Sequence, residues 1–508
     1  MQHATQTDIE AFLADPATHG GIKPRRFDTH ISTIFLAGTL AWKMKKAVKL
    51  PFLDFSTLEA RRAACEAEQA VNYRAAPALY QGVVAVTRDS GGNLRLGGDG
   101  QPLEWLVKMR RFDQKGLFSR QAATGRLDRA AIHGLTEAVW AFHREAPKRP
   151  DHGGAKGLAW TIDTNDTCFA GLTAELERAR TIALTRASLD WLARLTPRLE
   201  ERRAAGLVRA CHGDLHLGNI CLFDGRPTLF DAIEFSDDIA SIDVFYDLAF
   251  LLMDLERRAG RTLASYALNH YLDLSGDYGG VGCLPLLLSL RAAIRAHVSA
   301  TIARGHRNPK RRGLVAEANA YLDQALAYLS PMPPRLLAVG GLSGSGKSRM
   351  GRELAPFLAV PGAAVVRSDS LRKQIMGVGL LDRLGPEGYG PEMTERTYQA
   401  LYDTCAAILK DGHAVVADAV FAKPEQRERI EAVARAAGVR FDGLWLQADP
   451  EVTVERIATR KANVSDATPE VFQRQRDYDL GDIRWQVIDT SGSKEAALAA
   501  GLKCVLAG

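Results

Sequence analysis

A glycine-rich loop near residue 341 constrains the fold of this chain more than any other feature. Residues 341–348 read GLSGSGKS, a complete G-x-x-x-x-G-K-S pattern that follows the apolar run LLAV and opens the helical pattern SRMGRELAPFL. In this order of strand, loop and helix, backbone N–H groups at the helix N-terminus cradle phosphate groups. The pattern therefore predicts a parallel α/β sheet that binds a nucleotide.

The side chains of this loop predict ATP and Mg²⁺ as cofactors. Lys347 would place a point charge on the β- and γ-phosphates and take part in catalysis, and the hydroxyl of Ser348 would bind Mg²⁺. The residues expected to hold the nucleotide are Gly341, Ser343, Gly344, Ser345, Gly346, Lys347 and Ser348. The loop alone predicts nucleotide binding and leaves kinase activity open.

Acidic residues after the following strands favour catalysis. Asp369 follows the β-rich run AAVVRS, with Arg372 three residues later. Because the carboxyl ends of parallel strands line the ligand crevice, Asp369 should face the phosphate loop, where a carboxylate can deprotonate an attacking hydroxyl. Asp418 ends a second strand pattern, and Arg427 lies on the helical pattern behind it.

Two further arginines, Arg456 and Arg460, are one helical turn apart and would share a helix face. Such a pair on a mobile segment could close over the transferring phosphate. The alternative is that each aspartate caps a helix and each arginine faces solvent. Their shared order behind one phosphate loop favours a functional role.

That order resembles the P-loop kinases that phosphorylate hydroxyls, such as polynucleotide kinases, zeta toxins and gluconate kinases. The segments RSDSLRKQIM and DAVFAKPEQR are most similar to the polynucleotide kinase pattern. The resemblance implies that Asp369 is the general base, that Arg372 binds substrate, and that Arg456 or Arg460 acts as a lid. We expect Asp418 and Arg427 to contact the acceptor as well.

An earlier lysine predicts a second phosphate site. Residues 32–48, STIFLAGTLAWKMKKAV, read as two alternating strands, with Lys43 on the face opposite Trp42. A helical pattern that carries Glu66 and Glu68 follows. Protein kinases hold ATP phosphates with a strand lysine that is pinned by a helix glutamate. Glu68 is the preferred partner, and Glu66 stays open.

The segment CHGDLHLGN, residues 211–219, has two possible interpretations. On a strand, His212, Asp214 and His216 would share a face like metal ligands. As H-G-D-x-x-x-x-N it matches a kinase catalytic loop. A hairpin predicted from ICLF and PTLF would bring Asn219 and Asp231 together beside Asp214, as Mg²⁺ on ATP phosphates requires. We favour the kinase loop, because the metal-ligand interpretation leaves Asn219 and Asp231 unused.

These motifs resemble the aminoglycoside phosphotransferase-like kinases, in particular the branch fused to a P-loop kinase. The resemblance implies Lys43 on the ATP phosphates, Asp214 as catalytic base, Asn219 and Asp231 on Mg²⁺, and a bracing role for Asp247. One departure is the segment DTHIST, which stands where a G-x-G-x-x-G loop is expected. The family's fold does not make aminoglycosides the acceptor.

The expected fold class is α/β and α+β multidomain, with a protein-kinase-like bilobal fold followed by a P-loop parallel sheet. The segment SPMPPR ends a helical pattern and marks the last boundary. The expected domains are a kinase-like N-lobe at 1–110, a helical C-lobe at 111–330 and a P-loop kinase domain at 335–508.

Composition limits the classes of protein to consider. Of 508 residues 46% are hydrophobic and 25% charged, as in soluble globular proteins, and the net charge of +5 is a weak signal for nucleic acid. The seven cysteines are scattered, which argues against a disulfide framework or a zinc site. Neither a signal peptide nor a membrane span is expected, so a cytoplasmic protein with no membrane partner is predicted.

The predicted function is a bifunctional ATP-dependent phosphotransferase. Each module would transfer the γ-phosphate of ATP to a hydroxyl of a small-molecule or nucleotide acceptor. One alternative is a nucleic-acid 5′-hydroxyl kinase in the C-terminal module, which would need an aromatic-lined basic groove. Another is a regulatory nucleotide-binding protein with one inactive module. The sequence leaves the oligomeric state open.

Overall fold

The computed structural model describes residues 5–50, 53–459 and 464–506. Its internal contacts separate the chain into two compact units. Unit 1 consists of Met1–Trp160 and Thr196–Asp254, and unit 2 of Thr161–Leu195 and Leu255–Gly508. Unit 2 thus combines part of the helical region with the P-loop module, and the three expected domain boundaries stay a prediction.

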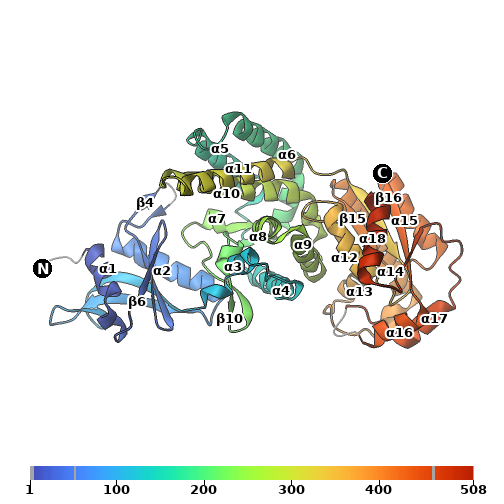
Figure 1. Cartoon of the computed structure of the whole chain (residues 1–508), viewed down its shortest axis with the longest axis horizontal. Coiled ribbons are helices and arrows are strands. Elements are labelled where there is room, and N and C mark those ends of the chain that lie inside the picture. The colour runs from blue at the N-terminus through green and yellow to red at the C-terminus, as the bar shows by residue number, and fades with distance from the viewer. Residues whose placement is uncertain (1–4, 51–52, 460–463, 507–508) are drawn as a thin grey trace. The chain divides into compact units, whose positions relative to one another are not determined.

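Unit 1 begins with a six-stranded antiparallel sheet (Figure 1). In spatial order its strands are β1 (Arg25–Asp28), β2 (Ser32–Ala37), β3 (Leu40–Lys45), β8 (Pro102–Arg110), β6 (Tyr80–Arg88) and β7 (Leu94–Leu96). Helix α1 (Gln6–Ala14) contributes Ile9 and Leu13 to a core with Trp42 and Met44 of β3. Because side chains alternate along β3, Lys43 and Lys45 face the other way.

The rest of unit 1 is mainly helical and carries two short strand pairs. Its helices include α2 (Leu58–Tyr73), α3 (Phe118–Ala123), α4 (Arg129–Glu145) and α7 (Asp237–Ala240). Helices α5 (Gly154–Ala170), α6 (Arg178–Ala204) and α8 (Val244–Ala259) each have residues in both units. Strand β9 (Val208–Ala210) pairs with β12 (Ser241–Asp243), and β10 (Ile220–Phe223) with β11 (Arg226–Leu229). The β10–β11 hairpin opposes Ile220 and Leu229, so Asn219 and Phe230 lie at its open end.

Unit 2 contains the parallel sheet predicted from the glycine-rich loop. The spatial order is β14 (Ala364–Arg367), β15 (Val415–Asp418), β13 (Arg335–Gly340), β16 (Arg440–Gln447) and β17 (Gln486–Asp489), all parallel. Its helices include α12 (Lys347–Leu354), α13 (Ser368–Ile375), α14 (Pro391–Lys410), α15 (Pro424–Ala437), α16 (Pro450–Ala458), α17 (Pro469–Arg476) and α18 (Lys494–Leu506). Together with the antiparallel sheet of unit 1, this confirms the predicted fold class.

Helices α9 (Arg261–Ser275), α10 (Leu284–Arg304) and α11 (Lys310–Tyr328) precede the parallel sheet in unit 2. Helix α9 lies against β14, an edge strand. The Asn269 side chain donates to the carbonyl of Ala363 at 3.0 Å and accepts from the N–H of Val365 at 2.7 Å. An amide side chain thus occupies two hydrogen-bonding groups that a neighbouring strand would otherwise take.

A helical segment of unit 2 has the length and composition of a membrane span. In the part of the chain that the structure describes, Tyr278–Arg304 is long and apolar enough to cross a membrane. However, 78% of its most apolar window is buried inside the structure. Core helices of globular proteins commonly have this composition, because a helix that is apolar all round packs on every side.

Candidate active sites

Lys43 of β3 lies at the centre of a buried ionic cluster in unit 1. Its Nζ is 2.8 Å from Oε1 of Glu68 on α2 and 2.5 Å from Oδ1 of Asp231. Glu66 instead faces outward and pairs with Arg62 at 2.8 Å. Of the two glutamates left open by the sequence, Glu68 is therefore the one that contacts Lys43.

A second lysine belongs to the same cluster. Nζ of Lys45 is 2.5 Å from Oε2 of Glu68 and also contacts Glu234. Burial opposes the charged form of Lys43, but Asp231 and Glu68 outweigh it and raise its pKa well above the ordinary value. No sequence motif marks Lys45 or Glu234 as a member of this cluster, although Lys45 shares the strand face of Lys43.

The segment from His212 to Asn219 forms a loop with bonds between its own side chains. Oδ2 of Asp214 accepts a hydrogen bond from Nδ2 of Asn219 at 2.9 Å. His212 is buried, and its Nε2 lies 3.0 Å from the carbonyl oxygen of Phe230. His212 is therefore directed at the hairpin, which leaves the interpretation of 212, 214 and 216 as one ligand set without support.

Asp247 of α8 holds the start of this loop. Its carboxylate accepts from the N–H of His212 at 2.9 Å and from the N–H of Gly213 at 3.0 Å. Gly213 has φ +79°, and an added Cβ would lie 3.1 Å from Cδ1 of Ile233. A glycine in the place where kinases usually carry arginine is thus explained by local backbone geometry.

A cleft of about 270 Å³ adjoins the ionic cluster in unit 1. Lys43, Asn219 and Asp231 line it together with apolar side chains that include Ile34, Leu36, Leu79, Met109 and Leu117. The Asp231 residue has φ +62°, and its N–H donates to Oη of Tyr80 at 3.1 Å. An apolar cleft with a few convergent polar groups is the usual form of a small-ligand site.

In unit 2 the glycine-rich loop connects β13 to α12 and needs its glycines. Gly341, Gly344 and Gly346 have φ of +136°, +86° and +93°, and a Cβ on Gly341 would lie 2.4 Å from the carbonyl oxygen of Leu446. Nζ of Lys347 donates to the carbonyl of Leu342 at 2.9 Å. The backbone cradle and this lysine fit a phosphate group.

Three further loop residues were expected to hold the nucleotide. Oγ of Ser345 is buried without a hydrogen-bond partner among the described residues, so it is a polar atom that a ligand could satisfy. The N–H of Ser343 donates to Oε1 of Gln475 at 2.8 Å, and Oγ of Ser348 accepts from Arg367 at 3.3 Å.

Asp369 and Arg372 lie on α13, directly after β14. Arg372 is buried; its Nη1 donates to the carbonyl of Gly388 at 2.6 Å, and its guanidinium lies 5.0 Å from the ring centre of Tyr389. Its Nε has no partner among the described residues. Arg372 thus keeps one donor that an acceptor group could use.

Asp418 ends β15 and is buried. Its Oδ2 lies 3.3 Å from Nε of Arg367, the last residue of β14. Arg367 also contacts Ser348 of the phosphate loop. Arg367 is not part of the motifs recognised in the sequence, although it directly precedes the Ser-Asp of α13.

The remaining arginines serve neighbouring backbone in this structure. Nη1 of Arg427 donates to the carbonyls of Phe421 and Ala422, both at 2.8 Å, and Nη2 donates to that of Asp482 at 3.2 Å. Arg456 donates to the carbonyl of Thr490 at 2.7 Å. Arg460 lies outside the described residues. Substrate-binding and lid roles for these residues stay predictions.

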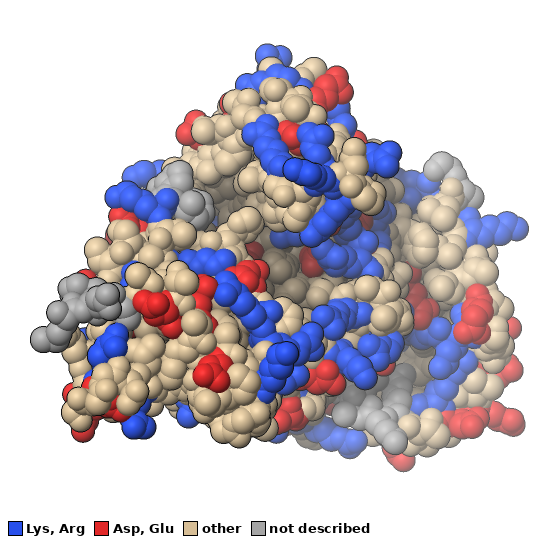
Figure 2. Space-filling view, turned by 60° about the vertical axis from the view of Figure 1, so that its left-hand side comes forward, with Lys and Arg blue, Asp and Glu red and all other residues tan. Residues whose placement is uncertain are grey.

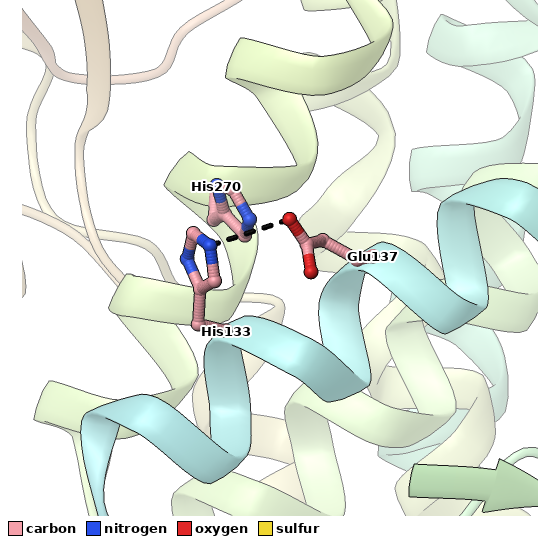
Figure 3. A group of neighbouring side chains, drawn as sticks. All are labelled: His133, Glu137 and His270. Atoms are coloured by element: carbon pink, nitrogen blue, oxygen red, sulfur yellow. Dashed lines mark ion pairs between the residues drawn. The ribbon is translucent and has the colours of Figure 1, made fainter. Parts of the chain in front are cut away.

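A histidine–glutamate pair on α4 is a different kind of contact. Nε2 of His133 lies 3.3 Å from Oε1 of Glu137, one helical turn away (Figure 3). Both side chains are about half exposed. Exposed pairs at this spacing contribute only a few tenths of a kcal/mol, about 0.2–0.5. The pair is sufficiently explained as helix surface.

Two family models match the chain. Residues 59–282 match the phosphotransferase enzyme family, and residues 336–478 match the AAA domain. An uncharacterized protein of Mycobacterium tuberculosis is 29% identical over 498 residues, which cover 93% of each chain. An uncharacterized protein of Mycobacterium bovis matches to the same extent.

Solved structures of kinases align with one module or the other. A choline kinase from Cryptosporidium parvum covers 64% of this chain and 96% of its own, with 11% identity and a TM-score of 0.42. A gluconokinase from Sinorhizobium meliloti covers 34% and 93%, with 22% identity and a TM-score of 0.24. The family matches confirm both resemblances stated from the motifs.

Proposed function

We propose that this kinase, which joins a phosphotransferase-family module to a P-loop module, transfers the γ-phosphate of ATP at two separate sites. The acceptors are hydroxyl groups of small molecules or nucleotides. The observation that carries the proposal is that each module has its own lysine and its own aspartate at the positions where the two kinase motifs require them: Lys43 with Asp214, and Lys347 with Asp369.

In the first module Glu68 holds the Lys43 ammonium group at the edge of the cleft, where it would contact ATP phosphates. Asp214 would accept the proton of the acceptor hydroxyl, and the Asn219 amide bonded to it would fix its orientation. Asn219 and Asp231 offer the oxygen ligands that Mg²⁺ prefers, and the ion would neutralise charge on the phosphates.

In the second module Lys347 and the loop N–H groups would hold the ATP phosphates, with Ser348 as a Mg²⁺ ligand. Asp369 would take the proton from the acceptor hydroxyl. Arg372 lies beside Tyr389, and its Nε, which has no hydrogen-bond partner in the part of the chain that the structure describes, would bind an anionic group on the acceptor. Arg427 is better suited to bracing its neighbouring loops, because its donors are occupied by backbone carbonyls.

A phosphorylated metabolite or a nucleotide is the preferred acceptor of the second module. In the sequence of the P-loop module lysine and arginine residues are interspersed with aspartate and glutamate residues, and the face drawn in Figure 2, which brings the N-terminal part of the chain forward, shows the same mixture there. Strand binding typically uses a basic groove with stacked aromatic side chains. The polynucleotide kinase-like segment RSDSLRKQIM favours the alternative, a nucleic-acid 5′-hydroxyl acceptor.

The test is to incubate the full chain with labelled ATP and a metabolite extract, and to identify the products by mass spectrometry. Asp214→Ala should lower the rate at which one product forms by about 100-fold or more, and Asp369→Asn should lower the rate for a different product. Glu66→Gln, which alters an exposed pair on α2, is the control and should keep both products. Loss of one and the same product in both variants would contradict two separate sites.

Oligonucleotides with a 5′-hydroxyl test the acceptor class in the same assay. Efficient labelling that depends on Asp369 and falls steeply with salt would establish the nucleic-acid alternative. Labelling of mononucleotides or sugars alone would support the preferred class.

A further inference from the structure

Arg367 lies among three polar groups that belong to two parts of unit 2. Its Nε is 3.3 Å from Oδ2 of Asp418, and its Nη2 is 3.3 Å from Oγ of Ser348. Its Nη1 is 3.6 Å from Oδ2 of Asp273, near the end of α9. The guanidinium is buried, so these contacts decide where its charge lies.

If the proposed function is correct, Mg²⁺ binds between Ser348 and Asp418, where the Arg367 guanidinium now lies. P-loop proteins hold Mg²⁺ with the loop hydroxyl and with a carboxylate from a neighbouring strand. Strand β15, which Asp418 ends, pairs directly with β13, which leads into the loop. A guanidinium and a divalent cation repel each other strongly at such short range. Arg367 therefore has to leave these oxygens when the metal binds.

Asp273 is the carboxylate available to receive it. Among the described residues, Arg367 forms ion pairs with Asp418 and with Asp273. Asp273 is buried, and other groups hold it in place: Oγ of Ser370 donates to its Oδ1 at 2.7 Å, and Arg352 contacts its Oδ2. A fixed carboxylate at 3.6 Å lets the guanidinium shift without losing a counter-charge.

We propose that Asp273 of α9 is a positioning residue for the P-loop site, which receives the Arg367 guanidinium when Mg²⁺ and nucleotide bind. This proposal rests on the proposed function of the second module. Arg367 then has two positions, one toward Ser348 and Asp418 and one toward Asp273. A helix that precedes the P-loop module in sequence thereby sets how much Mg²⁺ this site requires.

The experiment measures nucleotide binding rather than phosphate transfer. The fluorescent analogue mant-AMPPNP is titrated with Mg²⁺ on the full chain, and the signal that Lys347→Ala removes is taken as binding at the P-loop. Asp273→Asn should raise the Mg²⁺ concentration at half-maximal binding about tenfold, as couplings between contacting charges do. Arg367→Gln should lower it below the wild-type value.

The double variant separates positioning from a merely structural role. Since Asp273 acts through Arg367, Asp273→Asn in the Arg367→Gln background should leave the Mg²⁺ midpoint where Arg367→Gln alone puts it. Asp442→Asn is a matched control, because Asp442 is an ion-paired carboxylate at the opposite end of the sheet. Its midpoint should equal that of the wild type.

Several outcomes would overturn the proposal. Three results would show that Asp273 acts only by packing. The Mg²⁺ midpoint could be unchanged in Asp273→Asn, or the shifts of the two single variants could add up in the double variant. The third such result is a shift in Asp442→Asn as large as that in Asp273→Asn. If Asp273→Asn does not fold, a midpoint in Arg367→Gln at or above that of the wild type refutes the competition on its own. Unchanged analogue binding in Lys347→Ala would instead refute the P-loop assignment, and this proposal with it.

Discussion

Asp231 contacts Lys43 and also lines the cleft of unit 1, where we propose that the nucleotide binds. Its side chain is 45% exposed, and the metal-binding role proposed for it needs the carboxylate rather than the shape of the residue. Asp231→Asn keeps the shape and removes the charge. We expect metal-dependent turnover at the first site to fall about 100-fold or more, while the urea midpoint changes little.

To check this, turnover at the first site is measured as a function of Mg²⁺ concentration for the wild type and for Asp231→Asn. Urea unfolding is measured on the same samples. Activity at wild-type level in Asp231→Asn would return this residue to a structural role. The second site supplies the internal reference, since its product should be unaffected by a change in unit 1.

The ion pairs of Glu68 with Lys43 and Lys45 predict that the free energy of unfolding depends on pH. Burial alone would raise the pKa of its carboxyl, but Lys43 and Lys45 outweigh burial and hold this pKa at about 2. An unfolded glutamate titrates near pH ~4.3, so the ionised form stabilises the fold above that pH and the effect is lost as the pH falls toward the folded value. Glu68→Gln should cost about 3–5 kcal/mol near neutral pH, the range for a broken buried pair.

Urea unfolding at a series of pH values checks this prediction. The difference in free energy of unfolding between the wild type and Glu68→Gln should become smaller from pH ~5 downward, because the wild-type carboxylate becomes protonated. Glu66→Gln on the same helix should change stability by no more than about 0.5 kcal/mol, because its pair with Arg62 is exposed. A gap that is constant with pH would show that Glu68 acts by packing and not by charge.

At the scale of elements, the glycine-rich loop depends on backbone shape as much as on Lys347. Gly341→Ala would place a methyl group 2.4 Å from the carbonyl oxygen of Leu446, at a φ of +136° that other residues rarely adopt. We expect the loss of nucleotide binding at the P-loop, measured with the fluorescent analogue. The matched control is Gly313→Ala in α11, where none of the described residues has an atom within 4 Å of the added methyl group.

Gly313→Ala should stabilise the chain by about 0.5–1 kcal/mol, the usual gain of alanine over glycine within a helix. Binding of the analogue should be unchanged in this variant. If Gly341→Ala bound the analogue as well as Gly313→Ala does, the loop would not need its glycine.

Elements whose residues are near in sequence were the most predictable from sequence. The hairpin of β10 and β11 follows from two strand patterns around Asp224 and Gly225, and it brings Asn219 next to Phe230 and Asp231. The strand–loop–helix order around Lys347 likewise follows from local spacing.

Contacts between distant segments could not be predicted in the same way. Glu234 joins the Lys45 cluster from a position 189 residues away, and Arg367 meets Asp273 of a preceding helix. Neither contact corresponds to a residue spacing that can be recognised in the sequence. Arg427 shows the converse, because its place in a motif-like order predicted substrate binding while its donors are directed at backbone carbonyls.

For the molecule as a whole, the two nucleotide sites that we propose lie in different compact units, and this predicts two separate protected regions. With AMPPNP and Mg²⁺, backbone hydrogen exchange should slow in the segments around Lys43 and Asn219 and in the segment around Lys347. Lys347→Ala should remove protection from the last segment alone. Simultaneous loss of protection in all three would mean that the sites are not independent.

The Asn269 side chain on the edge of β14 has a practical consequence for where the chain can be cut. The proline-rich segment at residues 330–335 looks like a natural start for a recombinant fragment, yet a fragment beginning there lacks α9. The carbonyl of Ala363 and the N–H of Val365 would lose the hydrogen bonds that Asn269 provides. An unpaired strand edge tends to form hydrogen bonds with other chains. Expression from Arg335 should therefore yield aggregates, whereas a start ahead of Arg261 should give a monodisperse preparation by light scattering.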